Sequence, residues 1–113
     1  MNIPSEAYIV DDNGIPIGHI DFDKLTRDAT LLMYEMAETA GDDAATDRVA
    51  IRWTNRADIT PDYFGYLAAT ALSLTVRHVL APTLDAVAAA GVDLRPGLRA
   101  AADDARRDLN KVN

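Results

Sequence analysis

The chain of 113 residues contains no cysteine, which excludes disulfide frameworks and thiolate chemistry. Its only serines are Ser5 and Ser73, and neither lies in the Gly-x-Ser-x-Gly turn that exposes a nucleophilic serine. A glycine-rich phosphate loop is also missing from the sequence. We therefore predict no catalytic residue, no cofactor and no metal site, and we favour a binding protein over an enzyme.

The N-terminus lacks the charged, apolar and small-residue segments of a signal peptide. The longest apolar stretch is interrupted by Arg77 and His78, and its uninterrupted part is shorter than a bilayer requires. These features predict a cytoplasmic protein with no membrane span.

Charge is distributed unevenly along the chain, whose formal net charge is −7. Residues 1–47 hold two basic and eleven acidic side chains, whereas residues 48–113 hold nine basic and seven acidic ones. This asymmetry favours an electrostatically steered partner or head-to-tail self-association. The alternative is an acidic surface that only aids solubility.

Hydrophobic residues make up 49% of the chain, enough for one core, and the length predicts a single domain over 1–113. Alanine is the commonest residue, arginine outnumbers lysine, and aspartate outnumbers glutamate. This bias is typical of GC-rich genomes, and it indicates an actinobacterium or one of its phages as the source.

Two short segments of strand-forming residues, 7–10 and 15–20, flank the sequence Asp-Asp-Asn-Gly. Asn-Gly between such segments predicts a β-hairpin, and Pro16 predicts that its strand lies at an edge. The turn, the Ile-Gly that follows it and the next predicted helix resemble the second half of a CBS module. The first half of such a module is absent, so the resemblance implies no nucleotide binding here.

The longest predicted helix spans residues 61–90. Thr60 is a favourable N-cap, and Pro61 suits the first helical position. The helix is apolar over most of its circumference, which is typical of a central core helix or an oligomer contact. Pro82 removes a backbone hydrogen bond and predicts a kink or a break.

Further helices are predicted from Asp21 or Asp23 to about Ala40, and from about Pro96 to the end of the chain. Residues 48–54 alternate in a way that favours a third strand. A helix is the alternative there, because Val49 and Trp53 lie four residues apart. The resulting prediction is an α+β fold, in which a hairpin packs with three to four helices. The alternative is a mainly-α bundle.

The predicted helix before Gly41 carries two apolar side chains, Leu31 and Tyr34, on the face opposite its apolar stripe. Arg27 and Glu38 lie on the same outer face. An aromatic side chain ringed by charges is typical of a protein-binding hot spot. These four residues are our candidate interaction site, with coverage by the C-terminal helix as the alternative.

Other residue patterns have less support as sites. His19, Asp21 and Asp23 alternate as metal ligands on a strand would, but no further ligand completes the set. His78 lies on the apolar face of the central helix, where it suggests a catalytic base or, more often, a core histidine.

Arg48, Arg52 and Arg56 with Trp53 form a basic run that contains one aromatic residue. Such a run is compatible with nucleic-acid binding, but the overall acidity favours a solvated face.

The sequence therefore predicts a small acidic, non-enzymatic interaction or accessory protein. It would bind a protein partner or self-assemble as a homodimer or higher oligomer, and nucleic acid is not an expected partner. The alternative function is a small enzyme or ligand-binding domain with an aromatic pocket around His78, lined by Tyr63, Phe64 and Tyr66.

Overall fold

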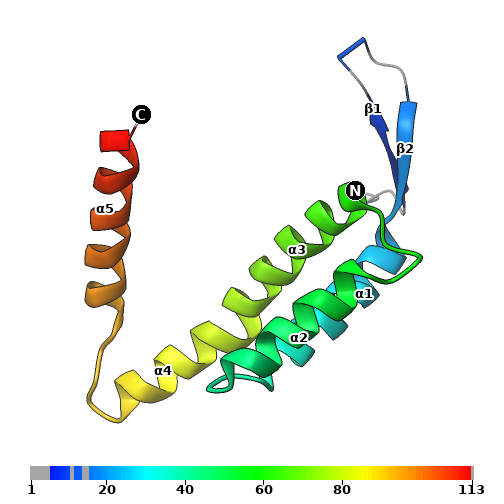
Figure 1. The fold of residues 1–113 in the computed structure, drawn as a ribbon. Coiled ribbons are helices and arrows are strands. Elements are labelled where there is room, and N and C mark those ends of the chain that lie inside the picture. The colour runs from blue at the N-terminus through cyan, green and yellow to red at the C-terminus, as the bar shows by residue number, and fades with distance from the viewer. Residues whose placement is uncertain (1–5, 11, 14–15, 113) are drawn as a thin grey trace, which may run out of the picture. The chain divides into compact units, whose positions relative to one another are not determined.

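A computed structural model of the chain describes residues 6–10, 12–13 and 16–112. Its residues cluster into two compact units, Met1–Val76 and Arg77–Asn113, which we call the N-terminal and C-terminal units. The elements follow in the order β1 (Glu6–Val10), β2 (Pro16–Asp21), α1 (Phe22–Ala37), α2 (Asp43–Thr54), α3 (Pro61–Thr75), a π-helical turn (Val76–Leu80), α4 (Ala81–Ala89) and α5 (Arg95–Val112) (Figure 1).

Each helix of the N-terminal unit begins at a side chain that accepts hydrogen bonds from its first turn. Asp21 Oδ1 accepts from the backbone amides of Asp23 at 2.9 Å and Lys24 at 3.2 Å. Asp42 Oδ1 accepts from Ala45 at 3.0 Å, and Thr60 Oγ1 accepts from Tyr63 at 3.1 Å. These caps satisfy amides that have no partner within the helix, and they fix where α1, α2 and α3 begin.

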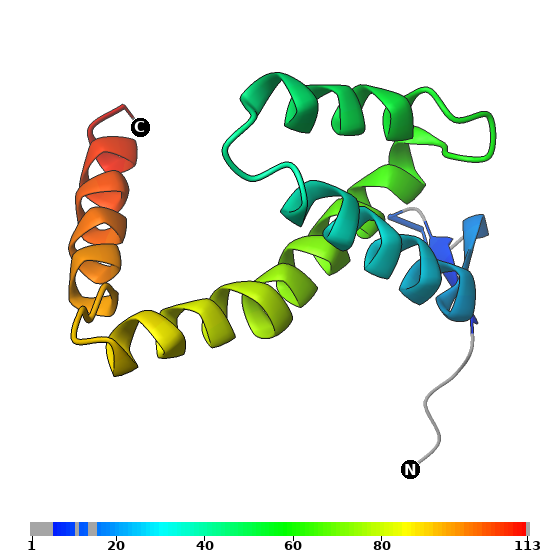
Figure 2. The same ribbon diagram turned by 90° about the horizontal axis from the view of Figure 1, so that it is seen from below.

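The core of the N-terminal unit forms where α1 packs against α3 and α2. Figure 2 shows α1 crossing α3, with α2 running beside α1. Trp53, Met33 and Leu67 are its largest fully buried side chains. The buried hydrophobic residues are Leu25, Ala29, Leu32, Met33, Val49, Trp53, Ile59, Leu67 and Ala71.

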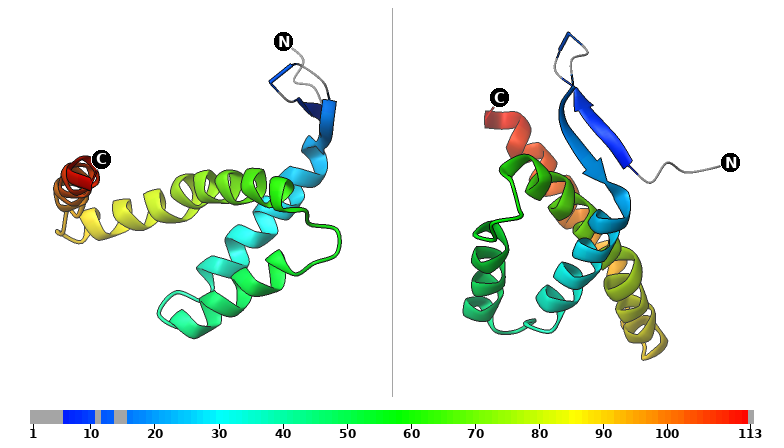
Figure 3. Two further views of the ribbon diagram at one scale, coloured as in Figure 1. Left: turned by 45° about the horizontal axis from the view of Figure 1, so that its top comes forward. Right: turned by 90° about the vertical axis from the view of Figure 1, so that its right-hand side faces the viewer.

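The predicted α+β class is wrong, and the mainly-α alternative fits the structure. Helices make up most of the described residues, and the described core comes from three helices and Ile59. Among the described residues, strands β1 and β2 pair only with each other (Figure 3). In their register, Glu6 lies opposite Asp21 and Tyr8 lies opposite His19. A two-stranded ribbon is too small to form a layer of the fold, so helix packing determines the architecture.

The predicted third strand at 48–54 is also wrong, because these residues belong to α2. Val49 and Trp53 are buried on one face, whereas Ile51 is exposed. A strand would have placed all three side chains on the same face. The four-residue spacing of Val49 and Trp53 was therefore the true periodicity, and the cap at Asp42 starts the helix that carries it.

The long central helix is continuous from Pro61 to Ala89. It departs from α geometry in the π-helical turn Val76–Leu80, just before Pro82. A proline ring clashes with the carbonyl four residues earlier in an α-helix, and here that carbonyl belongs to His78, inside the turn. The helix therefore accommodates Pro82 by widening the turn before it, and α4 begins at Ala81.

The C-terminal unit contains α4 and α5, joined at Gly91, whose φ of 100° is the left-handed conformation that suits glycine. The Arg95 guanidinium pairs with Asp85 at 2.8 Å across this connection. Within residues 77–111, whose burial is described, no side chain is buried. The unit therefore has helices but no core of its own.

Candidate interaction surface

An apolar groove with a volume of about 280 Å³ lies between α1 and α3. Leu32, Met33 and Met36 line it from α1. Five residues on one side of α3 line the other wall, namely Phe64, Ala68, Ala71, Leu72 and Thr75. Helical spacing brings these five to one side, and the small side chains of Ala68 and Ala71 leave the space between larger neighbours.

The groove offers apolar contact and no reactive group. Thr75 is its only lining residue with a polar side chain, and its hydroxyl donates to the Ala71 carbonyl at 2.7 Å. No titratable residue lines the groove. It can therefore bind apolar side chains by removing them from water, but it cannot perform acid–base chemistry.

A second cavity, of about 240 Å³, lies at the start of α3. Its lining includes Ile59, Pro61 and Phe64. Phe64 also lines the groove, so one aromatic ring borders both spaces. Each volume is slightly below the range of about 300–1,000 Å³ that is usual for small-molecule sites.

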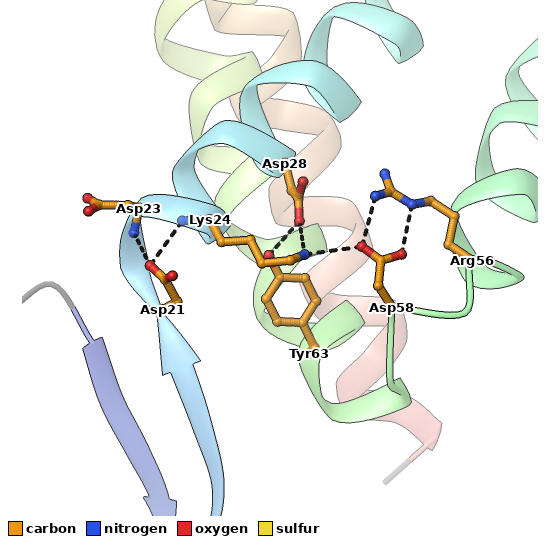
Figure 4. A network of polar contacts seen from close by, with 7 residues as sticks. All are labelled: Asp21, Asp23, Lys24, Asp28, Arg56, Asp58 and Tyr63. Atoms are coloured by element: carbon orange, nitrogen blue, oxygen red, sulfur yellow. Dashed lines mark hydrogen bonds and ion pairs between the residues drawn. The ribbon is translucent and has the colours of Figure 1, made fainter.

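A polar network lies at the beginning of α1 and α3 (Figure 4). Lys24 Nζ donates to Asp28 at 2.6 Å and contacts Asp58 at 3.4 Å, and the Tyr63 hydroxyl donates to Asp28 at 2.7 Å. Arg56 donates to both carboxylate oxygens of Asp58, at 3.1 and 2.9 Å. The network ties α1 to α3 and to the loop between α2 and α3.

Three groups of the network, Lys24, Asp58 and Tyr63, have pKa values that are shifted away from neutral pH. Partial burial, followed by the hydrogen bond to Asp28, raises the pKa of Tyr63 to about 12. Burial alone would lower the pKa of Lys24, but its hydrogen bond to Asp28 and the nearby negative charges raise it overall. The hydrogen bond from Arg56 lowers the pKa of Asp58. None of these three shifts moves a group toward pH 7, which supports a structural role.

The four residues of the predicted interaction site lie on one outer strip of α1, which ends at the C-cap residue Glu38. Leu31 is 49% exposed and Tyr34 is 58% exposed. Arg27 and Glu38 are exposed beside them. None of the four lines the groove, which lies on another side of α1. Their role in binding a partner stays a prediction.

The aromatic residues predicted to surround His78 are found in different places. Phe64 lines the groove, Tyr63 joins the polar network, and Tyr66 is 45% exposed. His78 itself is exposed in the π-helical turn. The structure therefore does not gather these residues into one pocket.

Two of the three arginines in the predicted basic run form ion pairs. Arg52 pairs with Glu35 of α1, and Arg56 pairs with Asp58. The Arg56 guanidinium also lies over the Trp53 ring, 4.5 Å from its centroid. Trp53 is buried beneath it, so its ring is not available to stack on a base.

The pattern of His19, Asp21 and Asp23 lies where β2 meets α1, and Asp21 acts there as the N-cap. The side chain of His19, and residues Asp11 and Gly14 of the predicted turn, lie outside the described residues. Among the residues that the structure does describe, no group of three or more His, Asp or Glu side chains could hold a metal ion.

The groove is the feature that sequence reasoning missed. Its α1 wall was visible as an apolar stripe, and α3 was visible as a helix apolar on most sides. The pairing of these two faces depends on tertiary packing, which periodicity does not specify. The only signal was the combination of large residues on one helix with Ala68 and Ala71 on the other.

The helix Pro61–Ala89 is long and apolar enough to cross a membrane by length and composition, with a mean hydropathy of 1.2. Only 11% of its most apolar window is buried within the protein. One such helix is a weak indication of a membrane span. The other residues of this window are exposed or partly buried.

Comparison with known proteins identifies no relative: no protein-family model, no curated protein and no solved structure matches the chain.

Proposed function

We propose that this protein is a non-enzymatic interaction protein whose groove between α1 and α3 binds an apolar helical segment of a protein partner. The groove carries the proposal, because all its lining side chains are apolar except Thr75, whose hydroxyl is already bonded. We propose that the protein acts in the cytoplasm and that its partners include further copies of itself.

The dimensions of the groove favour a helical segment. Its α3 wall extends from Phe64 to Thr75, a separation of eleven residues, or about 16 Å at 1.5 Å per residue. An amphipathic helix places side chains at positions i, i+4, i+7 and i+11 along such a length. Leu72, which is 66% exposed at the groove, would lose contact with water when a helix docks. Removal of this apolar surface from water favours binding.

The proposal is tested by photo-crosslinking from the groove in the native host. A photoreactive phenylalanine replaces Leu72, and a matched control places it at the exposed Arg48 of the same unit. We expect a specific product at position 72 alone. The captured partner, once purified, should bind the unmodified protein about 2 kcal/mol more tightly than it binds Leu72→Asp. Equal capture at both positions, or equal affinity for both proteins, would contradict the proposal.

The outer strip of α1 is the second contact that we propose for the same partner. We expect Leu31→Ser combined with Tyr34→Ser to weaken binding without changing the melting temperature, because both side chains are about half exposed. A lower melting temperature of the isolated protein would show instead that these side chains support the fold.

A small apolar ligand is the second candidate, because the groove and the neighbouring cavity share Phe64. The chain has three methionines, and two of them, Met33 and Met36, line the groove. Their ¹³C-methyl NMR signals should therefore shift when a straight-chain fatty acid binds there. Unchanged signals at saturating fatty acid would exclude this ligand class for the groove.

A further inference from the structure

Helix α5 has the sequence pattern of a helix that docks on another helix. Leu98, Ala102, Ala105 and Leu109 are separated by four, three and four residues, which places them on one stripe. Leu98 is 49% exposed and Leu109 is 63% exposed, and Ala105 is exposed between them. The opposite face carries Asp104 and Arg107, which form an ion pair with each other. The helix thus has a solvent face and an apolar face without a cover.

The apolar stripe of α5 matches the groove in length. Leu98 and Leu109 are eleven residues apart, about 16 Å along the helix. Phe64 and Thr75, at the two ends of the α3 wall, are also eleven residues apart. Ala102 and Ala105 in the middle of the stripe permit a close approach of the helix backbone to the groove.

The charges of the two regions are complementary. Residues 1–76 hold five basic and thirteen acidic side chains, a net charge of −8. Residues 95–112, which form α5, hold five basic and three acidic side chains, a net charge of +2. These opposite charges are complementary where α5 meets an N-terminal unit, although each whole chain carries a net charge of −7.

Both apolar faces are open to solvent in the described structure. Leu98 and Leu109 of α5 are 49% and 63% exposed, and Leu72 at the groove is 66% exposed. The Val92 amide donates to the Val87 carbonyl at 3.1 Å, which ties the connection before α5 to the end of α4. A second copy can therefore supply the cover that each face lacks.

We propose that α5 of a second copy occupies the groove between α1 and α3, so that two chains exchange their C-terminal helices. Each groove then receives the stripe of Leu98 and Leu109 from the other copy, and the assembly closes as a symmetric dimer. This inference rests on the proposed function of the groove, and it specifies the partner as another molecule of this chain.

The natural absence of cysteine makes disulfide mapping a direct test. Leu72→Cys protein is mixed under mild oxidation with Leu98→Cys protein and, separately, with Leu109→Cys protein. Docking brings one of these pairs within the Cα separation of about 7 Å that a disulfide requires. Arg107→Cys is the matched control, because Arg107 lies on the opposite face of α5 and is also exposed. All four positions are exposed, and circular dichroism checks that each variant keeps its helices.

We expect the disulfide between two different chains to form at least about tenfold more with position 98 or 109 than with position 107, a ratio worth about 1.4 kcal/mol. Light scattering should give twice the monomer mass of 12.2 kDa at high concentration. The combination of Leu98→Asp and Leu109→Asp should return the mass to that of the monomer.

Disulfide yields at positions 98 and 109 no higher than with the Arg107→Cys control would overturn the proposed exchange of C-terminal helices. A disulfide that forms only within one chain carrying both Leu72→Cys and Leu109→Cys would also overturn it, since the occupant would then be the same molecule. Either disulfide result could appear while the partner captured by crosslinking from position 72 still binds less tightly to Leu72→Asp. The groove would then keep its proposed function of binding a protein partner, and only the proposal that a second copy occupies it would be wrong.

Discussion

The two units of this protein contain similar helices but differ in what the helices pack against. Every buried hydrophobic side chain among the described residues lies between Leu25 and Ala71, in the N-terminal unit. In the C-terminal unit, α5 has a well-separated apolar stripe, yet Leu98 and Leu109 remain exposed. Amphipathic periodicity therefore shows that a face needs a cover, but it does not show whether the same chain provides one.

The polar contacts of the two units differ in the same way. In the N-terminal unit, Tyr63 donates to Asp28 and Lys24 contacts Asp58, so residues more than thirty positions apart are joined. In α5, three ion pairs connect residues three positions apart on the same helix, as in Asp103 with Arg106, and Arg95 at its start pairs with Asp85 of α4. Such local pairs contribute about 0.2–0.5 kcal/mol each to a helix and nothing to its tertiary position.

Hydrogen exchange should show the largest difference between the units. Amides of α1 and α3 pack around the core, so we expect them to exchange only through global unfolding, which costs about 5–15 kcal/mol in typical domains. In α5 the apolar side chains of Leu98 and Leu109 are exposed, so this helix lacks the tertiary packing that supplies most helical stability in proteins. We expect its amides to exchange close to the unprotected rate at micromolar protein concentration.

Measuring hydrogen exchange at several protein concentrations tests whether a second copy covers α5. If a second copy covers α5, its amides should become protected as the protein concentration rises, while those of α1 change little. Strong protection of α5 in dilute protein would contradict the difference between the units. It would show that α5 is covered within one chain.

The sequence predicted local features better than packing. Thr60 was recognisable as an N-cap because capping depends only on neighbouring residues: a hydroxyl side chain comes directly before Pro61 and the apolar helix that follows. The exposure of Leu31 and Tyr34 followed from the helical wheel of α1. Residues 48–54 were misassigned because an alternating pattern and a four-residue spacing coincide over so short a segment.

The groove could not be predicted because its two walls come from helices about thirty residues apart in the sequence. Met36 and Phe64 meet only after α1 and α3 have packed. The fold class was mispredicted for a related reason. Residues 7–10 and 15–20 carry strong local strand signals, but their small ribbon does not decide the architecture.

Substitution of two leucines on α3 compares a buried and an exposed apolar side chain within one helix. Leu67 has 0% exposure, whereas Leu72, five residues later, has 66%. We expect Leu67→Ala to lower the free energy of unfolding by about 2–5 kcal/mol, since it removes buried contacts and leaves a cavity. Leu72→Ala should change it by about 0.5 kcal/mol or less in dilute protein.

Urea unfolding followed by circular dichroism measures both variants at a concentration that keeps the protein monomeric. Equal losses would mean that Leu72 is covered within the chain, and the groove would not then be open to a partner.

The N-cap of α3 tests a smaller contribution to the N-terminal unit. The Thr60 hydroxyl oxygen accepts from the Tyr63 amide at 3.1 Å. We expect Thr60→Ala to reduce the free energy of unfolding by about 1 kcal/mol, because that amide loses its partner at the helix end. Thr60→Ser is the matched control, which keeps the acceptor and should remain within about 0.5 kcal/mol of the unmodified protein. A similar loss in both variants would assign the effect to the methyl group instead.

The smallest expected effect is a pH dependence that belongs to the polar network of the N-terminal unit. The pKa of Tyr63 is raised from 10.0 to about 12 by burial and by the hydrogen bond to Asp28, so the folded state holds the phenol proton more tightly than the unfolded state does. The stabilisation that the protonated Tyr63 hydroxyl gives to the folded state is therefore complete below pH 10 and is lost as the pH rises from 10 toward 12.

Thermal unfolding of the unmodified protein and of Tyr63→Phe should be compared between pH 8 and pH 11.5. We expect the stability advantage of tyrosine, about 1 kcal/mol or less because the site is partly exposed, to shrink across this range. Tyr63 and Lys24 shift each other's pKa values, so the comparison measures the two groups together. A difference that stays constant with pH would show that folding does not raise the pKa of Tyr63.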